Sequence, residues 1–161
     1  MNKTEALNNI RKKLSENKPT IGSWIQIPSN SNAEILGDAG YDWIAVDMEH
    51  GSISTSQLPD LFRALELNNT LPLVRLAQGE LKDAKSALDA GAGGIIIPMV
   101  ESANQLKEII GYSCWPPNGK RGVGYSRANL FGKNFDPDDK VSLNPLIIAQ
   151  IENIEAVSQI E

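Results

Sequence analysis

The feature of this sequence that most constrains its fold is a repeated alternation between short apolar runs and helical patterns. Apolar runs start near positions 21, 43, 72, 94 and 146. The first three intervals, of about 22 to 29 residues, are typical of βα repeats. The runs are continuously apolar, which indicates strands buried on both faces, as in a parallel sheet. The pattern therefore predicts an α/β fold, either a doubly wound open sheet or a (β/α)8 barrel.

The intervals between these runs carry apolar residues at helical spacing. Helices are expected to begin near positions 4, 29, 54, 80, 102 and 153, several of them after a Ser or Asn that can act as N-cap. Gly91, Gly93 and Gly94 precede a strand and do not join a strand to a helix, so they are not a dinucleotide-binding loop. No phosphate-binding loop motif is present either.

Length and charge exclude several other classes of protein. A chain of 161 residues is enough for one domain, so residues 1–161 are expected to form a single domain. The net charge of -5 and the lack of a basic block argue against nucleic acid. The longest apolar stretch, residues 95–100, is far shorter than a membrane helix, and no signal peptide is seen, so no membrane partner and a cytoplasmic location are expected. A single cysteine, Cys114, excludes a disulfide framework.

The interval between the fourth and fifth strands is the exception to the repeat. After its helix, residues 113–145 form a long stretch rich in Pro, Gly and Asp. Loops of this length inside compact domains are usually functional or mobile. We expect this loop to lie at the active-site face; a surface insertion is the alternative.

Chemically reactive side chains follow the predicted strands at their carboxyl ends. In parallel α/β folds ligands bind at this edge, because the βα loops open there. Several strands with the same pattern predict a shared pocket. The polar or aromatic residues in these positions are Trp24, Asp47, Glu49, His50, Arg75, Glu101, Gln150 and Glu152.

His50 and Arg75 are the main candidates for catalysis. His50 is the only histidine, so any imidazole chemistry near neutral pH falls to it, although it could also be an exposed loop residue. Arg75 stands between two apolar residues, where its guanidinium needs an anion. That anion could be a ligand carboxylate or enolate, or an internal partner such as Asp47, Glu49 or Glu101.

Gln150 and Glu152 are two residues apart, so on a strand they would share a face. A carboxylate in a polar barrel mouth is a good ligand for a hard metal ion. One carboxylate does not define a site, and Glu152 could instead be a helix N-terminal residue favoured by the dipole. Spacing alone predicts Trp24 in the core and Cys114 as an inert thiol.

The order and spacing of several motifs resemble the HpcH/HpaI aldolase family over roughly residues 20–156. The Asp-x-Glu-His and Pro-Pro-x-Gly-x-Arg-Gly stretches are together quite specific. The matching motifs are Gly22-Ser23-Trp24, Ala33-Glu34-Ile35-Leu36, Ala39-Gly40-Tyr41-Asp42-Trp43, Asp47-Met48-Glu49-His50-Gly51, Leu73-Val74-Arg75, Pro98-Met99-Val100, Pro116-Pro117-Asn118-Gly119-Lys120-Arg121-Gly122-Val123-Gly124 and Gln150-Ile151-Glu152.

The resemblance implies a (β/α)8 barrel and a role for each matching residue. His50 corresponds to the general base and Arg75 to the arginine that stabilises the enolate. Asp89 corresponds to an acid that raises the basicity of the histidine. Gln150 corresponds to a substrate-contacting glutamine, and Glu152 to one metal ligand.

The resemblance also implies that Trp24 is an aromatic residue at the active site. The activity implied is that of a class II aldolase, a carbon–carbon lyase that depends on Mg²⁺ or Mn²⁺, with Co²⁺ possible. Its partners would be a 2-oxo acid such as pyruvate and an aldehyde, and a homo-oligomer is expected. Another metal-dependent enolate lyase acting on acyl thioesters is one alternative, and a non-catalytic half-barrel interaction module is another.

The length departs from the family pattern, because such barrels run to about 250 residues. Only about five βα units are expected here, and the second metal carboxylate of the family has no counterpart. We therefore expect a fragment of a longer product that is nearly inactive on its own; completion of the barrel core by another chain is the alternative.

Overall fold

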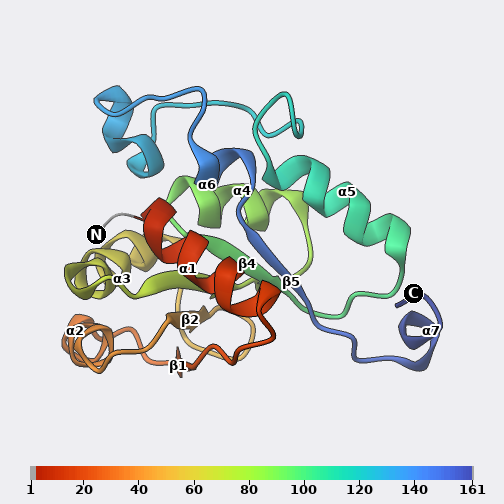
Figure 1. The fold of residues 1–161 in the computed structure, drawn as a ribbon, viewed down its shortest axis with the longest axis horizontal. Coiled ribbons are helices and arrows are strands. Elements are labelled where there is room, and N and C mark those ends of the chain that lie inside the picture. The colour runs from red at the N-terminus through yellow and green to blue at the C-terminus, as the bar shows by residue number, and fades with distance from the viewer. Residues whose placement is uncertain (1–2, 161) are drawn as a thin grey trace.

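The computed structural model describes residues 3–160, which contain a sheet of five strands joined by helices (Figure 1). The strands are β1 (Gly22–Ile25), β2 (Trp43–Asp47), β3 (Leu71–Arg75), β4 (Gly94–Ile97) and β5 (Leu146–Ala149). The helices are α1 (Lys3–Ser15), α2 (Asn30–Asp38), α3 (Leu58–Leu65), α4 (Leu81–Asp89), α5 (Ala103–Ser113), α6 (Lys140–Leu143) and α7 (Ile154–Val157), with 3-10 turns η1 (Thr55–Gln57), η2 (Glu66–Asn68) and η3 (Arg127–Gly132). No helix within residues 3–160 is long and apolar enough to cross a membrane.

Each strand pairs in parallel with the strand that follows it along the chain, in the order β1-β2-β3-β4-β5. A doubly wound sheet would reverse this order at a switch point. Sequential parallel order is the arrangement of a (β/α)8 barrel, so the chain is a partial TIM-type barrel. The predicted α/β fold is confirmed, and the barrel is the correct choice of the two architectures.

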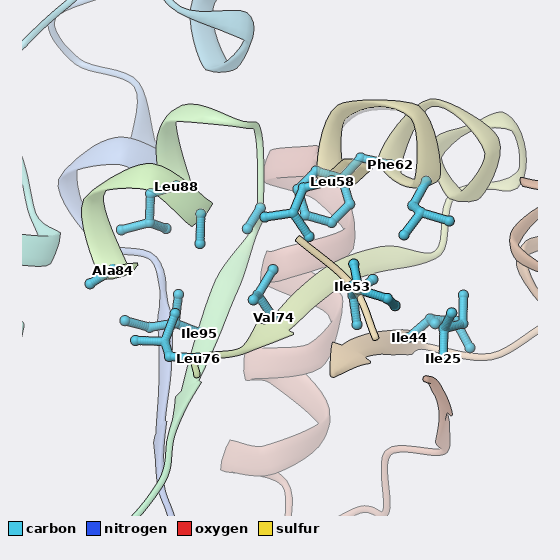
Figure 2. Close-up of a cluster of buried hydrophobic side chains, with 14 of the residues drawn as sticks. Ile25, Ile44, Ile53, Leu58, Phe62, Val74, Leu76, Ala84, Leu88 and Ile95 are labelled. Carbon is cyan, nitrogen blue, oxygen red and sulfur yellow. The ribbon is translucent and has the colours of Figure 1, made fainter. Parts of the chain in front are cut away.

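One face of the sheet packs against the helices that connect the strands. Alternate strand residues such as Ile44, Val74 and Ile95 point to this face and are fully buried. They meet Leu58 and Phe62 of α3, together with the apolar side of α4, in one cluster (Figure 2). Because strand side chains alternate in direction, the remaining strand residues point to the other face.

Helix α1 covers the amino-terminal half of that other face. Its Leu7 and Ile10 are buried against Ala45, Leu73 and Ile96, whose strands are β2, β3 and β4. The helical spacing of the apolar residues of α1 therefore has a structural reason, since one side of the helix closes a second small core.

Polar contacts fix α1 across the amino ends of the strands. Lys3 donates to the carbonyl of Gly91 at 3.1 Å, just before β4. Lys13 pairs with Asp42, just before β2. Arg11 donates to the carbonyl of Asn144 at 2.5 Å, just before β5. The amino edge of the sheet is thus closed by this helix.

The segment 113–145 also lies at the amino edge, so the prediction that it lies at the active-site face is wrong. It starts where α5 ends and leads into β5, and a helix that follows a parallel strand runs back to the amino edge. Arg127 of this segment binds Glu66 at 2.8 Å and the carbonyl of Ala90 at 3.1 Å, close to the starts of β3 and β4. The topology therefore separates this long loop from the carboxyl ends of the strands.

The packing of α1 predicts that Leu7→Ala will lower the free energy of unfolding by about 2–4 kcal/mol, because it removes a fully buried side chain and leaves a cavity. Leu14→Ala on the same helix is the control, since Leu14 is 51% exposed and should change stability by less than about 0.5 kcal/mol. Urea unfolding followed by circular dichroism measures both. Equal effects of the two variants would show that α1 does not close the core.

Candidate active site

The carboxyl edge of the sheet gathers residues from the inner face of its strands. Asp47, the last residue of β2, is directly opposite Arg75, the last residue of β3. Trp24 of β1 pairs with Ala45, so its side chain shares the inner face with Asp47 two residues further on. The parallel register therefore brings Trp24, Asp47 and Arg75 together. The position of Asp47 and Arg75 at the ends of apolar runs predicted this, whereas the prediction from spacing that Trp24 lies in the core is wrong, because Trp24 is 42% exposed.

The Asp47 carboxylate is fully buried and organises this edge. It accepts hydrogen bonds from Arg75 Nε at 2.9 Å and Nη2 at 2.5 Å, and from Gln26 Nε2 at 2.8 Å. It also accepts from the backbone N–H groups of Glu49 at 3.1 Å and His50 at 3.2 Å. Burial by itself would raise the pKa of Asp47, but the hydrogen bonds from Arg75, Gln26 and His50 outweigh it and hold the pKa far below its usual range.

Arg75 is held on three sides. Two of its nitrogens bind Asp47, and Nη1 lies 3.3 Å from Glu49 Oε2. Its Cζ lies 4.8 Å from the centre of the Trp24 ring, a cation–π contact. Hydrogen bonding to Asp47 raises the pKa of Arg75 despite its burial, so the guanidinium stays charged. The internal ion pair considered from the sequence is therefore present, and it lies at the edge where ligands bind in this fold.

His50 lies on the loop after β2 with its side chain 67% exposed, and its Nε2 is 3.8 Å from Glu49 Oε2. Its backbone is fixed by Asp47, and Gly51 follows because any Cβ there would collide with the carbonyl of Asp47. Glu49 thus lies between Arg75 and His50. Gln26 was not predicted at this edge, whereas Asp47 and Glu49 were predicted to lie there but were given no catalytic or binding role.

Gln150 and Glu152 reach the same edge from the end of β5. The backbone of Gln150 continues the pairing with β4, and its Oε1 is buried without a hydrogen-bond partner. Glu152 lies beyond the strand, is exposed, and accepts a hydrogen bond from the N–H of Met99 at 2.8 Å. Met99, which follows β4, has a left-handed backbone with a φ of 50°. The negative charge of Glu152 also contributes to the raised pKa of Arg75, so the two side chains attract each other electrostatically.

Asp89 is not part of this cluster within the chain. It is the last residue of α4, which starts after the carboxyl end of β3 and ends at the amino edge before β4. There its carboxylate lies 3.9 Å from Arg121 Nε, and burial raises its pKa against the opposing charges of Arg121 and Lys85. The predicted effect of Asp89 on His50 therefore has no structural basis inside one copy of the chain.

The described residues at this edge provide only part of a binding site for a divalent metal ion. The Glu152 carboxylate has suitable oxygen donors and one of them is occupied by Met99. Within residues 3–160, no group of three or more His, Cys, Asp or Glu side chains is arranged to hold a metal ion. The described residues offer one carboxylate ligand and do not complete a metal centre.

The fold and the site define the class of this protein: it is a partial TIM-type barrel with a charged cluster at the carboxyl edge of its sheet. A family model described as HpcH/HpaI aldolase/citrate lyase matches residues 20–161. The chain therefore belongs to the HpcH/HpaI aldolase/citrate lyase family, and the resemblance inferred from its motifs is confirmed.

Similar proteins support this assignment. A hydroxypyruvate/pyruvate aldolase of Roseobacter denitrificans is 38% identical over 91% of this chain and 58% of its own length. A 4-hydroxy-2-oxo-heptane-1,7-dioate aldolase of Escherichia coli is 30% identical over 95% of this chain and 59% of its own length. The crystal structure of a family member from Burkholderia cenocepacia aligns with a TM-score of 0.86 and 31% identity, covering 94% of this chain and 62% of that one. The chain thus spans about three fifths of the length of these relatives.

The low pKa of Asp47 predicts how stability changes with pH. A carboxyl with a depressed pKa in the folded state stabilises the protein above its unfolded pKa of about 4, and this stabilisation is lost as the pH falls. Between pH 6 and pH 2, the wild type should lose on the order of 2 kcal/mol more unfolding free energy than Asp47→Asn.

Urea unfolding at a series of pH values measures this difference. Asp60→Asn is the control, because Asp60 is an exposed residue that pairs with Arg63 on the surface of α3. The control should follow the wild-type pH dependence. Parallel curves for wild type and Asp47→Asn would show that the buried ion pair does not form.

Proposed function

We propose that this chain provides the enolate-stabilising half of an aldolase site that joins or separates a 2-oxo acid, such as pyruvate, and an aldehyde. The observation that carries the proposal is the Arg75 guanidinium, held by Asp47 at the carboxyl edge. Glu49 links it to the exposed His50 imidazole, and the Glu152 carboxylate is near enough to raise its pKa. The names of the relatives support the reaction class, since they include aldolases of pyruvate, hydroxypyruvate and larger 2-oxo acids.

The reaction needs a base and a stabilised anion. In the cleavage direction, a base removes the proton from the hydroxyl group, the neighbouring C–C bond breaks, and the electron pair forms the enolate of the 2-oxo acid while the aldehyde leaves. Protonation of the enolate carbon then gives the 2-oxo acid. His50 is the candidate base, because its imidazole is exposed at the edge and its backbone is anchored.

Arg75 is the candidate for stabilising the enolate. A preorganised cation stabilises charge without having to reorient during the reaction, and Asp47 and Trp24 hold this guanidinium in place. Gln150 is the candidate for contacting the substrate, since its Oε1 has no partner in the protein. Trp24 would form a wall of the site, with one ring face already covered by Arg75.

Glu152 is the ligand that this chain would contribute to a Mg²⁺ or Mn²⁺ ion, with Co²⁺ as a further candidate. Such an ion would act as a Lewis acid toward the enolate oxygen. A Schiff-base mechanism is disfavoured, because no lysine occupies the two positions after any of the strands β1–β5.

An acyl-thioester lyase is the main alternative, since the family name covers citrate lyase as well as aldolases. Comparing turnover of pyruvate plus aldehyde with turnover of acyl thioesters separates the two. A non-catalytic interaction module would turn over neither.

The role of His50 predicts that His50→Ala will lower aldol turnover by about 10²-fold or more. The assay follows pyruvate plus a panel of aldehydes with Mg²⁺ or Mn²⁺, on the natural polypeptide that carries this sequence, whether or not it extends beyond Glu161. Ser52→Ala, an exposed change on the same loop, should keep wild-type turnover. Wild-type turnover by His50→Ala would exclude this residue as the base.

The role of Arg75 predicts that Arg75→Lys will slow the exchange of the pyruvate methyl protons with solvent by about 10²-fold, because one ammonium cannot replace the two-pronged guanidinium. Proton NMR in D₂O measures the exchange, and Arg63→Lys on the surface of α3 is the control. Unchanged exchange in Arg75→Lys would contradict the enolate role. A wild type that exchanges no methyl protons would contradict the proposed function itself.

A further inference from the structure

We propose that Glu49 is a positioning residue that determines which ring nitrogen of His50 acts as the base. Its Oε2 atom lies 3.8 Å from Nε2 of His50. An ionised carboxylate only accepts hydrogen bonds, so it favours the neutral imidazole with its proton on Nε2, and Nδ1 then keeps the lone pair that can take a proton. The catalytic consequence of this tautomer rests on the proposed function, whereas the tautomer itself can be measured without turnover.

The Oε2 atom of Glu49 is a buried acceptor that has no hydrogen-bond partner within residues 3–160. Arg75 Nη1 attracts it by charge from 3.3 Å, without donating a hydrogen bond to it. Buried polar atoms in proteins nearly always have a partner, so a nearby donor is expected for this oxygen. The imidazole of His50 supplies a donor that already lies beside it and does not have to enter from solvent.

The Asp47 carboxylate, which binds the backbone of His50, does not compete for the imidazole. Among the described residues, its Oδ1 accepts three hydrogen bonds and its Oδ2 accepts two. An ionised carboxylate has about four lone-pair sites, so these bonds use its capacity. Glu49 Oε2 is therefore the acceptor of this cluster that is left for the ring of His50.

Glu49 is held in place, whereas the ring of His50 has room to move toward it. The side chain of Glu49 is 17% exposed, its backbone N–H is bound by Asp47 at 3.1 Å, and its carboxylate pairs with Arg75. The side chain of His50 is 67% exposed, and exposed side chains reorient on a fast timescale. Because a hydrogen bond requires a separation of about 2.7–3.2 Å, a displacement of about 1 Å is sufficient.

The contact assigns separate tasks to the two ring nitrogens. In the proposed cleavage, Nδ1 of His50 takes the hydroxyl proton while the Nε2–H group stays bonded to Glu49. The imidazolium that forms is positive, and the carboxylate beside it stabilises this charge without taking the proton. Because Arg75 pairs with the same oxygen, Glu49 connects the base with the cation that stabilises the enolate.

Long-range ¹H–¹⁵N correlation NMR measures the tautomer, because the ¹⁵N shift of a protonated ring nitrogen differs from that of a nitrogen with a lone pair. The ¹⁵N-labelled natural polypeptide that carries this sequence is studied at a pH where the ring shifts no longer change, and His50→Ala identifies the signals. In the wild type, Nε2 should carry the proton and Nδ1 the lone pair. In Glu49→Ala, the ratio of the Nε2–H form to the Nδ1–H form should fall at least about fivefold, because the charged acceptor is lost.

Two further variants complete the experiment. Glu49→Gln keeps the shape of the side chain and removes its charge, so it should lower the ratio too, and it decides if Glu49→Ala fails to fold. Glu101→Ala removes an exposed carboxylate after β4, two strands from the loop of His50, and should leave the ratio unchanged. A wild type with the proton on Nδ1, or the same ratio in the wild type and the Glu49 variants, would overturn the proposal.

The aldol turnover assay separates the role of Glu49 from the proposed function. A lower tautomer ratio in Glu49→Gln together with turnover reduced about tenfold would support both. A lower ratio in a protein whose wild type has no aldol turnover would support the role of Glu49 as the residue that orients His50 and reject the aldolase function. Wild-type turnover with an unchanged ratio in the Glu49 variants would reject the role of Glu49 alone.

Discussion

The buried carboxylate of Asp47 is the interaction on which the carboxyl edge of this barrel depends. One fully buried anion accepts hydrogen bonds from the residue after β1, from β3 and from the loop after β2, so it fixes Gln26, Arg75 and the backbone of His50 at once. Isolated, such a charge would be very costly to bury. The guanidinium of Arg75 compensates it, which leaves a positively charged group held rigidly at the edge where substrates of this fold bind.

The two ends of the sheet serve different purposes. At the carboxyl ends the inner face carries Trp24, Asp47 and Arg75, whereas at the amino ends it is apolar and covered by α1. Helix packing at one end stabilises the sheet, so the other end can hold a charged cluster. The strand period of two puts the apolar residues and the charged cluster on the same face, because the same side-chain direction recurs along each strand from one end to the other.

Several parts of this arrangement could be predicted from local sequence. Continuous apolar runs separated by helical patterns indicated the parallel βα repeat, and polar residues after those runs indicated the edge with Trp24, His50, Arg75 and Gln150. The segment 113–145 was placed at the wrong edge because length and composition do not reveal direction; direction follows from its position after a helix and before a strand. Asp89 was assigned by family resemblance alone, and the fold places it at the opposite end of α4 from the cluster.

The sequence by itself determined the order of elements and the chemical groups available, because both depend on hydrophobic period and residue type over short stretches. Only the tertiary structure decided which groups meet. Asp47 and Arg75 are 28 positions apart, and the parallel register makes them partners. Arg121 and Lys3 line one cavity because α1 crosses the amino ends of strands far from it in the chain. Such contacts depend on strand pairing and chain direction, which no local pattern contains.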